Sequence, residues 1–469
     1  MNTGENSIDL SKLSIRQRAI LEKRLGERRN KNVAAVEQAV SASGRDEDNK
    51  VLATSVGGVE DLLAKFYGRF PWPWLPMKFD YLVDPDFETC ALNQDVGDYT
   101  HGTVPLKPAI WVAGCGTNQA INTALKFPNA SVIGSDISQK SLEICARNSR
   151  DLSISNLELR EESINNAAYS EQFDHVICTG VIHHNADPQI SLARLAAALK
   201  PGGIMEIMVY NRYHRSVTSA FQKAMRIFGE NRGAIDFEAD LAIAQKVAAS
   251  LPVKSLLEKG FIMYMDLSES DFADLLIQPV EHSYTVESLE EVAENCGLEM
   301  LYPCISMYAK WLASNSWNID FGDAELQQAY DSLPDTRRWQ VTNLLLHEKS
   351  PLLWFYLQRK DSPNKRKSES EVCEEFLNAT FEKAHTTQRS FLRGEGDRYH
   401  PGHNSLPYPM TRPDDSVKAI YDRVDAKTSM RRIFEQLEIT QTFQNVNNAR
   451  IKLTTSAFPY CRAVKPRVN

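Results

Sequence analysis

The sequence lacks several features that mark exported, membrane or metal-bound proteins. Its eight cysteines include no C-x-x-C pair, which argues against a disulfide framework or a structural metal site. No apolar run reaches the roughly 18–20 residues of a membrane span. The polar start at residues 1–6 lacks the basic and apolar regions of a signal peptide. The sequence therefore predicts a soluble, cytoplasmic protein with no bound metal.

An excess of positive charge is also absent. The chain has 53 Lys and Arg against 61 Asp and Glu, a net charge of −8, so its overall field does not attract polyanions. We therefore expect neither a nucleic-acid nor a membrane partner. The 42% hydrophobic and 24% charged residues exclude a collagen, a coiled-coil rod or a disordered chain. A length of 469 residues predicts two or three structural units.

Strands and helices alternate from about residue 107 onward. Apolar runs predict five strands, and helical spacing predicts three helices between them; the strands are at 109–113, 131–136, 156–161, 175–179 and 204–210, and the helices at 117–127, 138–151 and 189–200. A turn is expected at 201–203. Helices of this length between strands require parallel crossovers. The sequence therefore predicts an α/β fold with a doubly wound, mainly parallel sheet, which continues in a helix at 286–296 and a strand at 298–301.

The remaining segments suggest a domain organisation around this sheet. We expect an N-terminal helical and polar segment at 1–59, a main domain at 60–320 with a helical insertion at 211–283, a core extension at 321–364, and a charged linker with a small module at 365–469. The insertion suits either a lid over the strand ends or a packing annex. Alternating aromatics and prolines at 66–76 predict a stiff extended loop, either a substrate lid or an arm that caps the core.

A Gly-x-Gly turn is the most informative local feature. Gly114 and Gly116 follow an apolar strand and precede a helix, so the backbone can approach a nucleotide-like ligand closely. A dinucleotide fingerprint would need a third glycine where Gln119 stands, so no pyrophosphate site is expected. Asp136, 22 residues after Gly114, ends the next strand and can accept both hydroxyls of a ribose or cap the following helix. A ribose without a pyrophosphate points to S-adenosylmethionine.

At these residues the sequence resembles the class I S-adenosylmethionine-dependent methyltransferases. It is most similar to a bacterial subgroup with the strings AGCGTNQA, IDIS, FDxIxxTGVLHHxxDP and LKPGG, which correspond to residues 113–120, 135–138, 173–188 and 199–203. The resemblance covers roughly residues 60–310. It implies a Rossmann-like class I methyltransferase fold, S-adenosyl-L-methionine as cofactor, and methyl transfer as the reaction.

The resemblance also implies roles for individual residues. The cradle for the methionine portion of the donor would be formed by Gly114, Cys115 and Gly116, with Thr117 at the helix start. Asp136 would hold the ribose, and Ile137 would lie beside the adenine. Other contacts would come from the turn after the third strand, with Ser163 and Ile164, and from the end of the fourth strand, with Thr179 and Gly180.

Two positions depart from the pattern of many relatives. An aspartate often stands where this chain has Ser163, and an acidic residue that orients the methionine ammonium often stands where it has Ala113. A backbone carbonyl or another side chain must then replace the acidic group at Ala113. These departures leave open a non-catalytic binding subunit that retains the methyltransferase fold.

His183 and His184 follow the fourth strand, where relatives bring methyl donor and acceptor together. Adjacent residues of an extended segment point to opposite sides, so we expect one of the two histidines in the pocket. A histidine there can accept a proton from the acceptor near pH 7. The alternative is that both histidines pack and shape the loop.

The leading functional hypothesis is a methyltransferase for a small-molecule acceptor, with specialised metabolism as a candidate setting. The alternative enzymatic hypothesis is a protein or RNA methyltransferase, although no N-P-P-[YF] motif follows the fourth strand. The string LSxxxRxxLxxRL within residues 8–26 is similar to segments beside condensation and ketosynthase domains. It suggests a carrier-protein or assembly-line partner, or else a surface-packed helix. The acceptor, the methylated atom and the oligomeric state stay open.

Overall fold

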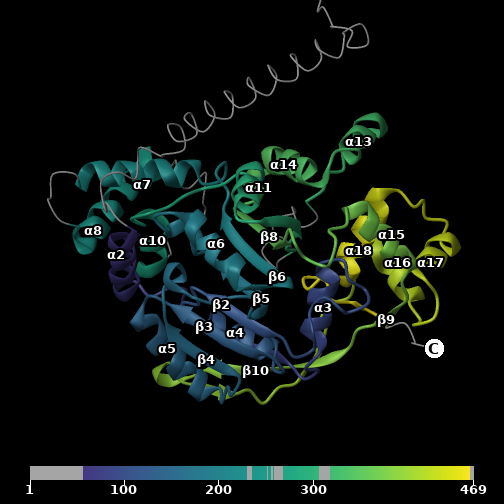
Figure 1. Ribbon diagram of the computed structural model, residues 1–469, viewed down its shortest axis with the longest axis horizontal. Helices are drawn as coiled ribbons and strands as arrows, with labels where there is room; N and C mark the ends of the chain where they lie inside the picture. The colour runs from purple at the N-terminus through teal and green to yellow at the C-terminus, as the bar shows by residue number, and fades with distance from the viewer. Residues whose placement is uncertain are drawn as a thin grey trace, which may run out of the picture. The chain divides into compact units, whose positions relative to one another are not determined.

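A computed structural model describes residues 56–229, 235–250, 252–254, 257, 268–305 and 317–464. The described part belongs to one compact unit, Ser55–Asn469, shown in Figure 1. The helix expected at 8–26 lies outside the described residues. A seven-stranded sheet forms the centre of the unit.

The sheet has the strand order β4-β3-β2-β5-β6-β8-β7. The first five strands in this order pair in parallel, and β8 is antiparallel to both of its neighbours. This arrangement confirms the predicted doubly wound, mainly parallel sheet. The strands are β2 (Ala109–Ala113), β3 (Ser131–Asp136), β4 (Leu157–Glu161), β5 (Phe173–Thr179), β6 (Leu199–Tyr210), β7 (Leu298–Pro303) and β8 (Leu352–Arg359).

The crossover helices begin at the side chains that the sequence predicts as caps. Ser138 accepts a hydrogen bond from Ser141 N at 3.2 Å, and Asp187 accepts one from Gln189 N at 3.0 Å, as N-cap residues do. Thr285 closes a capping box before the fourth helix. The four helices are α4 (Gln119–Lys126), α5 (Gln139–Asp151), α6 (Pro188–Ala198) and α11 (Val286–Asn295). Within the described ranges, no helix combines the length and apolar character needed to cross a bilayer.

Two features of the sheet differ from the sequence prediction. The residues expected to form a turn at 201–203 lie within β6, where the register with β5 shifts from Phe173↔Leu199 to His175↔Ile204. The extra residues are absorbed as an irregularity of a continuous strand. Strand β8 lies in the segment expected only as a core extension, and its pairing with β6 and β7 joins parts that are far apart along the chain.

The insertion after β6 packs with the N-terminal helix of the described chain. Figure 1 shows α2 (Val56–Arg69) beside α7 (Ser216–Gly229), α8 (Phe237–Ala248) and α10 (Glu269–Leu276). Buried side chains of these helices form a second apolar cluster, which includes Phe66, Phe221, Leu241 and Leu276. Residues 66–69 are helical rather than part of an extended loop, because the first proline of that segment comes only at position 71.

The C-terminal part of the chain interleaves with the segment before β2. A small sheet joins β1 (Lys78–Leu82) to β10 (Thr386–Arg393), which also pairs with β11 (Tyr399–Pro401) and β12 (Leu406–Tyr408). A second pair joins β9 (Phe381–Lys383) to β13 (Cys461–Ala463). The helices of this part and its surroundings are α3 (Phe87–Asp95), α13 (Ala324–Asp331), α14 (Asp335–Leu345), α15 (Glu369–Asn378), α16 (Asp415–Arg423), α17 (Met430–Gln436) and α18 (Phe443–Thr454).

The stretch expected to be a charged linker contains the first turn of α15. Ser368 closes a capping box at its start. Glu369 is buried and accepts hydrogen bonds from Arg338 Nη2 at 2.5 Å and from Trp339 Nε1 at 3.1 Å. A buried carboxylate with charged and neutral donors of this kind is well compensated, so the stretch contributes to the packed interior.

Candidate active site

A glycine turn joins β2 to α4. Gly114 and Gly116 have φ angles of +71° and +55°, a region that residues with a Cβ seldom adopt. Gly114 N and Cys115 N both donate to the carbonyl oxygen of Ser135 in β3, at 2.8 and 2.9 Å. These main-chain bonds hold the turn against the end of the neighbouring strand.

Asp136, the last residue of β3, bridges the turn and the next helix. Its Oδ2 accepts from Gly116 N at 2.8 Å, and its Oδ1 accepts from Ser138 N at 2.8 Å. Burial raises the pKa of Asp136, while these backbone donors act in the opposite direction. A carboxylate oxygen has two lone pairs, so each oxygen can accept a further hydrogen bond from a hydroxyl. The geometry is compatible with a ribose acceptor, whereas the N-cap of α5 is Ser138 rather than Asp136.

An aromatic strap, residues 72–74, lies on the glycine turn. The three carbonyl oxygens of the strap accept, in chain order, from Thr117 N at 3.2 Å, from Thr117 Oγ1 at 2.5 Å and from Asn118 Nδ2 at 2.8 Å. A Cβ on Gly116 would lie 2.5 Å from the carbonyl oxygen of Trp72, closer than real Cβ contacts. Glycine at position 116 is therefore required by the strap.

A carboxylate from α2 reaches the turn that follows β4. Ser163 Oγ donates to Glu60 Oε1 at 2.5 Å, and Asn165 Nδ2 donates to the same oxygen at 2.7 Å. Glu60 thus brings an acidic group beside Ser163, where many relatives have an aspartate in the turn itself. Ile164 is buried and Ile137 is half-buried. No local pattern indicates Glu60 as a site residue, because it comes from a helix about a hundred residues earlier.

Gln119, the first residue of α4, links this helix to the end of β5. Its Nε2 donates to Thr179 Oγ1 at 2.5 Å, so the side chain that replaces a third glycine links α4 to β5. Gly180 has a φ of +79° and its N–H donates to Met208 O at 3.1 Å. Ala113 is buried at the end of β2 and contributes no polar side chain.

The histidine turn, η4 (Ile182–His184), is a short 3-10 helix rather than the extended segment that we expected. The rings of His183 and His184 pack against each other with centroids 4.2 Å apart, and both residues are buried. His184 Nδ1 lies 2.8 Å from the carbonyl oxygen of Val280 and donates to it. Neither ring nitrogen of His183 has a hydrogen-bond partner among the described residues. The structure therefore distinguishes the two histidines by their partners.

Both histidines are neutral near pH 7. Burial lowers the pKa of His183 well below its ordinary value, and repulsion from a protonated His184 and from Arg215 acts in the same direction. Burial also lowers the pKa of His184 to about 4. The ring of Tyr210 lies against His183 with centroids 4.2 Å apart. A neutral imidazole has one unprotonated nitrogen that can accept a proton.

A polar cluster joins α2 to the insertion beside the histidine turn. Tyr67 OH donates to Asp274 Oδ1 at 3.1 Å, and Gln278 Nε2 donates to Tyr67 OH at 2.7 Å. Burial raises the pKa of Asp274 to about 7. Arg215 pairs with Glu281 through Nε at 2.9 Å and Nη2 at 2.5 Å. Asp274, Gln278 and Glu281 lie in a segment that resembles the methyltransferase subgroup, but no local pattern predicts their contact with Tyr67 or Arg215, because the members are spread over more than two hundred residues.

The groups around the glycine turn fit the chemistry of S-adenosylmethionine. The carboxylates of Asp136 and Glu60 can accept from ribose hydroxyls and from an adenine amino group. Main-chain carbonyls of the turn can accept from an ammonium group, and Ile137 and Ile164 offer apolar surface for a planar ring. The residues at the ends of β2, β3 and β4 thus supply acceptors where this donor has hydrogen-bond donors.

Comparison with known proteins identifies the same chemistry. Residues 113–265 match the model of a family described as methyltransferase domain. An uncharacterised protein of Synechococcus is 29% identical over 300 residues, which cover 61% of this chain and 69% of the relative. A ubiquinone biosynthesis O-methyltransferase of Dinoroseobacter shibae is 31% identical over 167 residues, which cover 34% of this chain and 66% of the relative.

Among solved structures, PKMT2 from Rickettsia typhi has a similar fold. The alignment covers 84% of this chain and 77% of PKMT2, with a TM-score of 0.51 and 13% sequence identity. A second structure of PKMT2 is a complex with AdoHcy, and it aligns with a TM-score of 0.50 and 14% identity. At this level of identity the likeness concerns the fold.

The sheet order, with its antiparallel β8, and the matched domain define a class I methyltransferase fold. The chain is a methyltransferase that uses S-adenosylmethionine as its methyl donor. The fold, the enzyme class and the cofactor predicted from the sequence are therefore confirmed. The contacts assigned to individual residues stay predictions, to which the structure adds Glu60, Tyr67 and Asp274.

Proposed function

We propose that this enzyme methylates a small-molecule acceptor bound beside the histidine turn. The main support for this proposal comes from His183. It is 0% exposed, and its two ring nitrogens lack a hydrogen-bond partner among the described residues. Buried polar groups almost always have hydrogen-bond partners, and an acceptor hydroxyl or amine would supply one. Two relatives that bear the name ubiquinone biosynthesis O-methyltransferase support an acceptor of small size. We also assign the chain to the bacterial subgroup with the AGCGTNQA string.

In this proposal His183 takes the proton that the acceptor loses. S-adenosylmethionine, when bound, supplies a methyl group on a positively charged sulfur, and the carbon–sulfur bond breaks as an acceptor lone pair bonds to the carbon. His183 stays neutral because burial lowers its pKa well below the ordinary value. The lowered pKa makes His183 a weaker base than a free imidazole, but the acceptor becomes strongly acidic as its lone pair bonds to the methyl carbon, so the unprotonated ring nitrogen can take the proton. His184, through its bond to Val280 O, positions the turn.

The donor would be held by groups on three strand ends and on α2. Asp136 would accept from the ribose hydroxyls while it keeps its bonds to Gly116 N and Ser138 N. Glu60, held by Ser163 and Asn165, would accept from the adenine amino group. Main-chain carbonyls of the glycine turn would replace the acidic side chain that Ala113 lacks.

The first experiment separates donor binding from the choice of acceptor. Isothermal titration of the full chain with sinefungin is expected to show one binding site. Incubation of a cell extract with a radiolabelled methyl donor is then followed by separation into small-molecule, protein and RNA fractions. Label in the small-molecule fraction supports the proposal. Label confined to protein or RNA would overturn the acceptor class while it leaves donor binding intact.

The second experiment tests His183 against its neighbour. His183→Ala is expected to lower the single-turnover rate by about a hundredfold with sinefungin affinity unchanged. His183→Gln keeps the size and polarity of the side chain but accepts no proton, so it should be equally slow. His184→Ala serves as the matched control, with a loss of thermal stability and a smaller loss of rate. Equal rates for the wild-type chain and His183→Gln would exclude the proposed base.

A further inference from the structure

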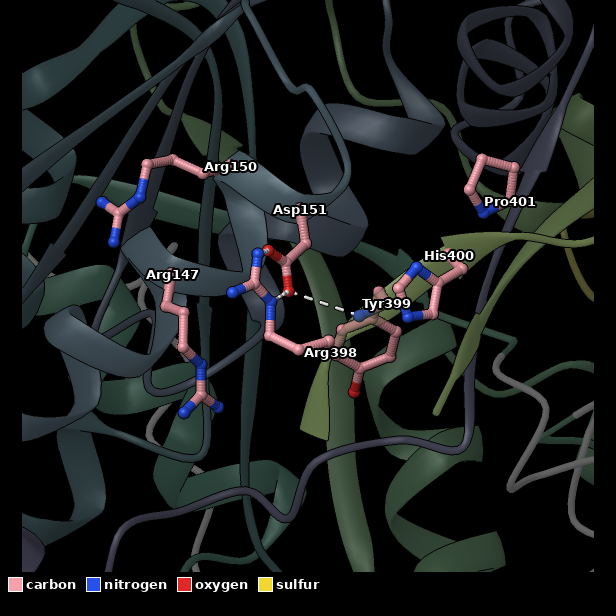
Figure 2. A pocket seen from close by; sticks show the side chains of 7 residues that line it. All are labelled: Arg147, Arg150, Asp151, Arg398, Tyr399, His400 and Pro401. Atoms are coloured by element: carbon pink, nitrogen blue, oxygen red, sulfur yellow. Dashed lines mark hydrogen bonds and ion pairs between the residues drawn. The ribbon is translucent and has the colours of Figure 1, made fainter. Parts of the chain in front are cut away.

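A hollow lies between the C-terminal end of α5 and β11, at the other end of α5 from Asp136. Its volume is about 470 Å³. Figure 2 shows the residues that line it, among them Arg147, Arg150, Asp151, Arg398, Tyr399 and His400. Arg147 is eight residues beyond the start of α5 at Gln139, which is about 12 Å along the helix. The hollow is therefore separate from Asp136 and the glycine turn.

Positive charge dominates the walls of this hollow. Asp151 is the one carboxylate of the lining and forms an ion pair with Arg398. Burial raises the pKa of Asp151, but the bond to Arg398 outweighs this and holds that pKa below its ordinary value. The carboxylate of Asp151 is therefore ionised and pairs with Arg398. Neither Arg147 nor Arg150 forms a salt bridge with a described residue. Arg147 Nε donates to Asn148 Oδ1 at 3.3 Å, and the charge of Arg147 helps to lower the pKa of Asp151. Three guanidinium groups against one carboxylate thus leave the lining with a net charge of +2, in a chain whose net charge is −8.

The position of the arginines at a helix end does not by itself account for them. The C-terminal end of a helix carries a partial charge of about −0.5, which is smaller than the two charges of Arg147 and Arg150. Positive side chains three residues apart on one helix face repel each other. A third guanidinium, that of Arg398, comes to the same place from a segment nearly 250 residues later. Convergence of like charges around a hollow favours an anion between them.

The lining groups suit a phosphate group better than a bare ion. Guanidinium groups bind phosphate oxygens through paired hydrogen bonds. The ring of Tyr399 is buried, and its hydroxyl donates to Pro76 O at 2.7 Å. Burial also raises the pKa of Tyr399 to about 12, so the phenol adds no negative charge. The charged groups therefore face a hollow in which Tyr399 adds no charge, and the hollow is larger than one phosphate ion needs.

We propose that this hollow, which we call the arginine pocket (Arg147, Arg150, Arg398 and Tyr399), binds the phosphate group of a soluble small molecule. Arg147 and Arg150 contact the phosphate oxygens, while Asp151 holds Arg398 in the wall. The proposal does not depend on the identity of the methyl acceptor, nor on donor binding.

Isothermal titration calorimetry tests the pocket. The full chain is titrated with inorganic pyrophosphate and, separately, with inorganic phosphate. Saturating sinefungin is present in a parallel series to occupy the donor site. We expect one site whose affinity for pyrophosphate is unchanged by sinefungin and falls as sodium chloride is raised. Adenosine diphosphate is the third probe, and tighter binding than pyrophosphate would show that the organic part is also held. Binding that sinefungin abolishes would place the anion at the donor site and overturn the proposal.

Charge variants locate the site. Arg147→Ser and Arg150→Ser are each expected to weaken pyrophosphate binding about threefold or more, and the double variant about tenfold or more. Asp151→Asn removes the single negative charge of the lining and should strengthen binding. Arg194→Ser, at an exposed arginine of α6, is the matched control and should leave the affinity unchanged. Equal affinities for the wild-type chain and the double variant would show that the arginines only form a solvated helix end.

Discussion

The glycine turn and the histidine turn follow neighbouring strands of one sheet, β2 and β5, yet their polar groups differ. In the glycine turn, the N–H groups of Gly114, Cys115 and Gly116 all donate within the protein, and both oxygens of Asp136 accept. In the histidine turn, His183 is buried with neither nitrogen bonded to a described residue. The first region keeps its shape by itself, and the second is left with hydrogen bonds that a ligand can complete.

Substitution of Asp136, in the glycine turn region, should have the largest effect on donor binding. Asp136→Ala removes the ribose acceptor and frees Gly116 N and Ser138 N, so we expect sinefungin to bind about a hundredfold more weakly, or about 3 kcal/mol. Isothermal titration measures this change. Asp236→Ala removes a carboxylate that also accepts from backbone N–H groups, as the N-cap of α8, and should cost stability alone. Similar sinefungin affinities for the two variants would remove Asp136 from the donor site.

A Cβ on the glycine turn tests whether the strap shapes the region. Gly116→Ala would bring a methyl group to 2.5 Å from Trp72 O at a φ of +55°, and we expect a loss of about 2–3 kcal/mol in the free energy of unfolding. Gly322→Ala has a φ of +67° with nothing within 4 Å and should cost about 1 kcal/mol. Urea titration followed by tryptophan fluorescence measures both. Equal losses would mean that the strap is not held against Gly116.

The polar cluster beside the histidine turn should contribute less to the stability of the folded chain as the pH rises. A carboxylate in an ordinary ion pair shows the opposite trend. Asp274 has a pKa of about 7 in the folded chain and about 3.9 when unfolded, so the folded state binds the extra proton. The stability from this proton is complete below about pH 4 and is lost as the pH rises towards 7. Asp274→Asn mimics the protonated form.

We therefore expect Asp274→Asn to be more stable than the wild-type chain by about 2 kcal/mol at pH 8, with little difference at pH 4. Thermal unfolding at a series of pH values provides the measurement. Asp61→Asn, on the exposed side of α2, is the control and should show no such trend. A stability difference for Asp274→Asn that is constant with pH would contradict the assigned protonation.

The smallest effect is expected for Glu60, the carboxylate of α2 that contacts the turn after β4. Glu60→Ala removes the partner of Ser163 and Asn165, and sinefungin affinity should fall three- to tenfold, about 1 kcal/mol. Asp61→Ala, one residue further along α2 and exposed, should bind sinefungin as the wild-type chain does. The ratio of the two dissociation constants gives the contribution of Glu60. A ratio near one would contradict its assignment to the adenine.

Local patterns predicted much of the central domain. The apolar run at 109–113 and the Gly-x-Gly turn after it correspond to β2 and its turn, and the caps Ser138 and Asp187 begin their helices as expected. These features depend on neighbours within a few residues, so the sequence carries their signal directly. The extended loop expected at 66–76 is only partly correct, because α2 continues to Arg69 before the prolines begin.

What the sequence by itself determined is the chemistry of the donor: a glycine turn, a carboxylate one strand over, and an alternation that places both at the same edge of a parallel sheet. Only the tertiary structure decided which of two adjacent histidines lacks a partner, that Glu60 lies beside Ser163, and that β10 pairs with β1. These contacts join segments separated by about a hundred to three hundred residues. Packing of the whole chain selects them, and no local spacing encodes them.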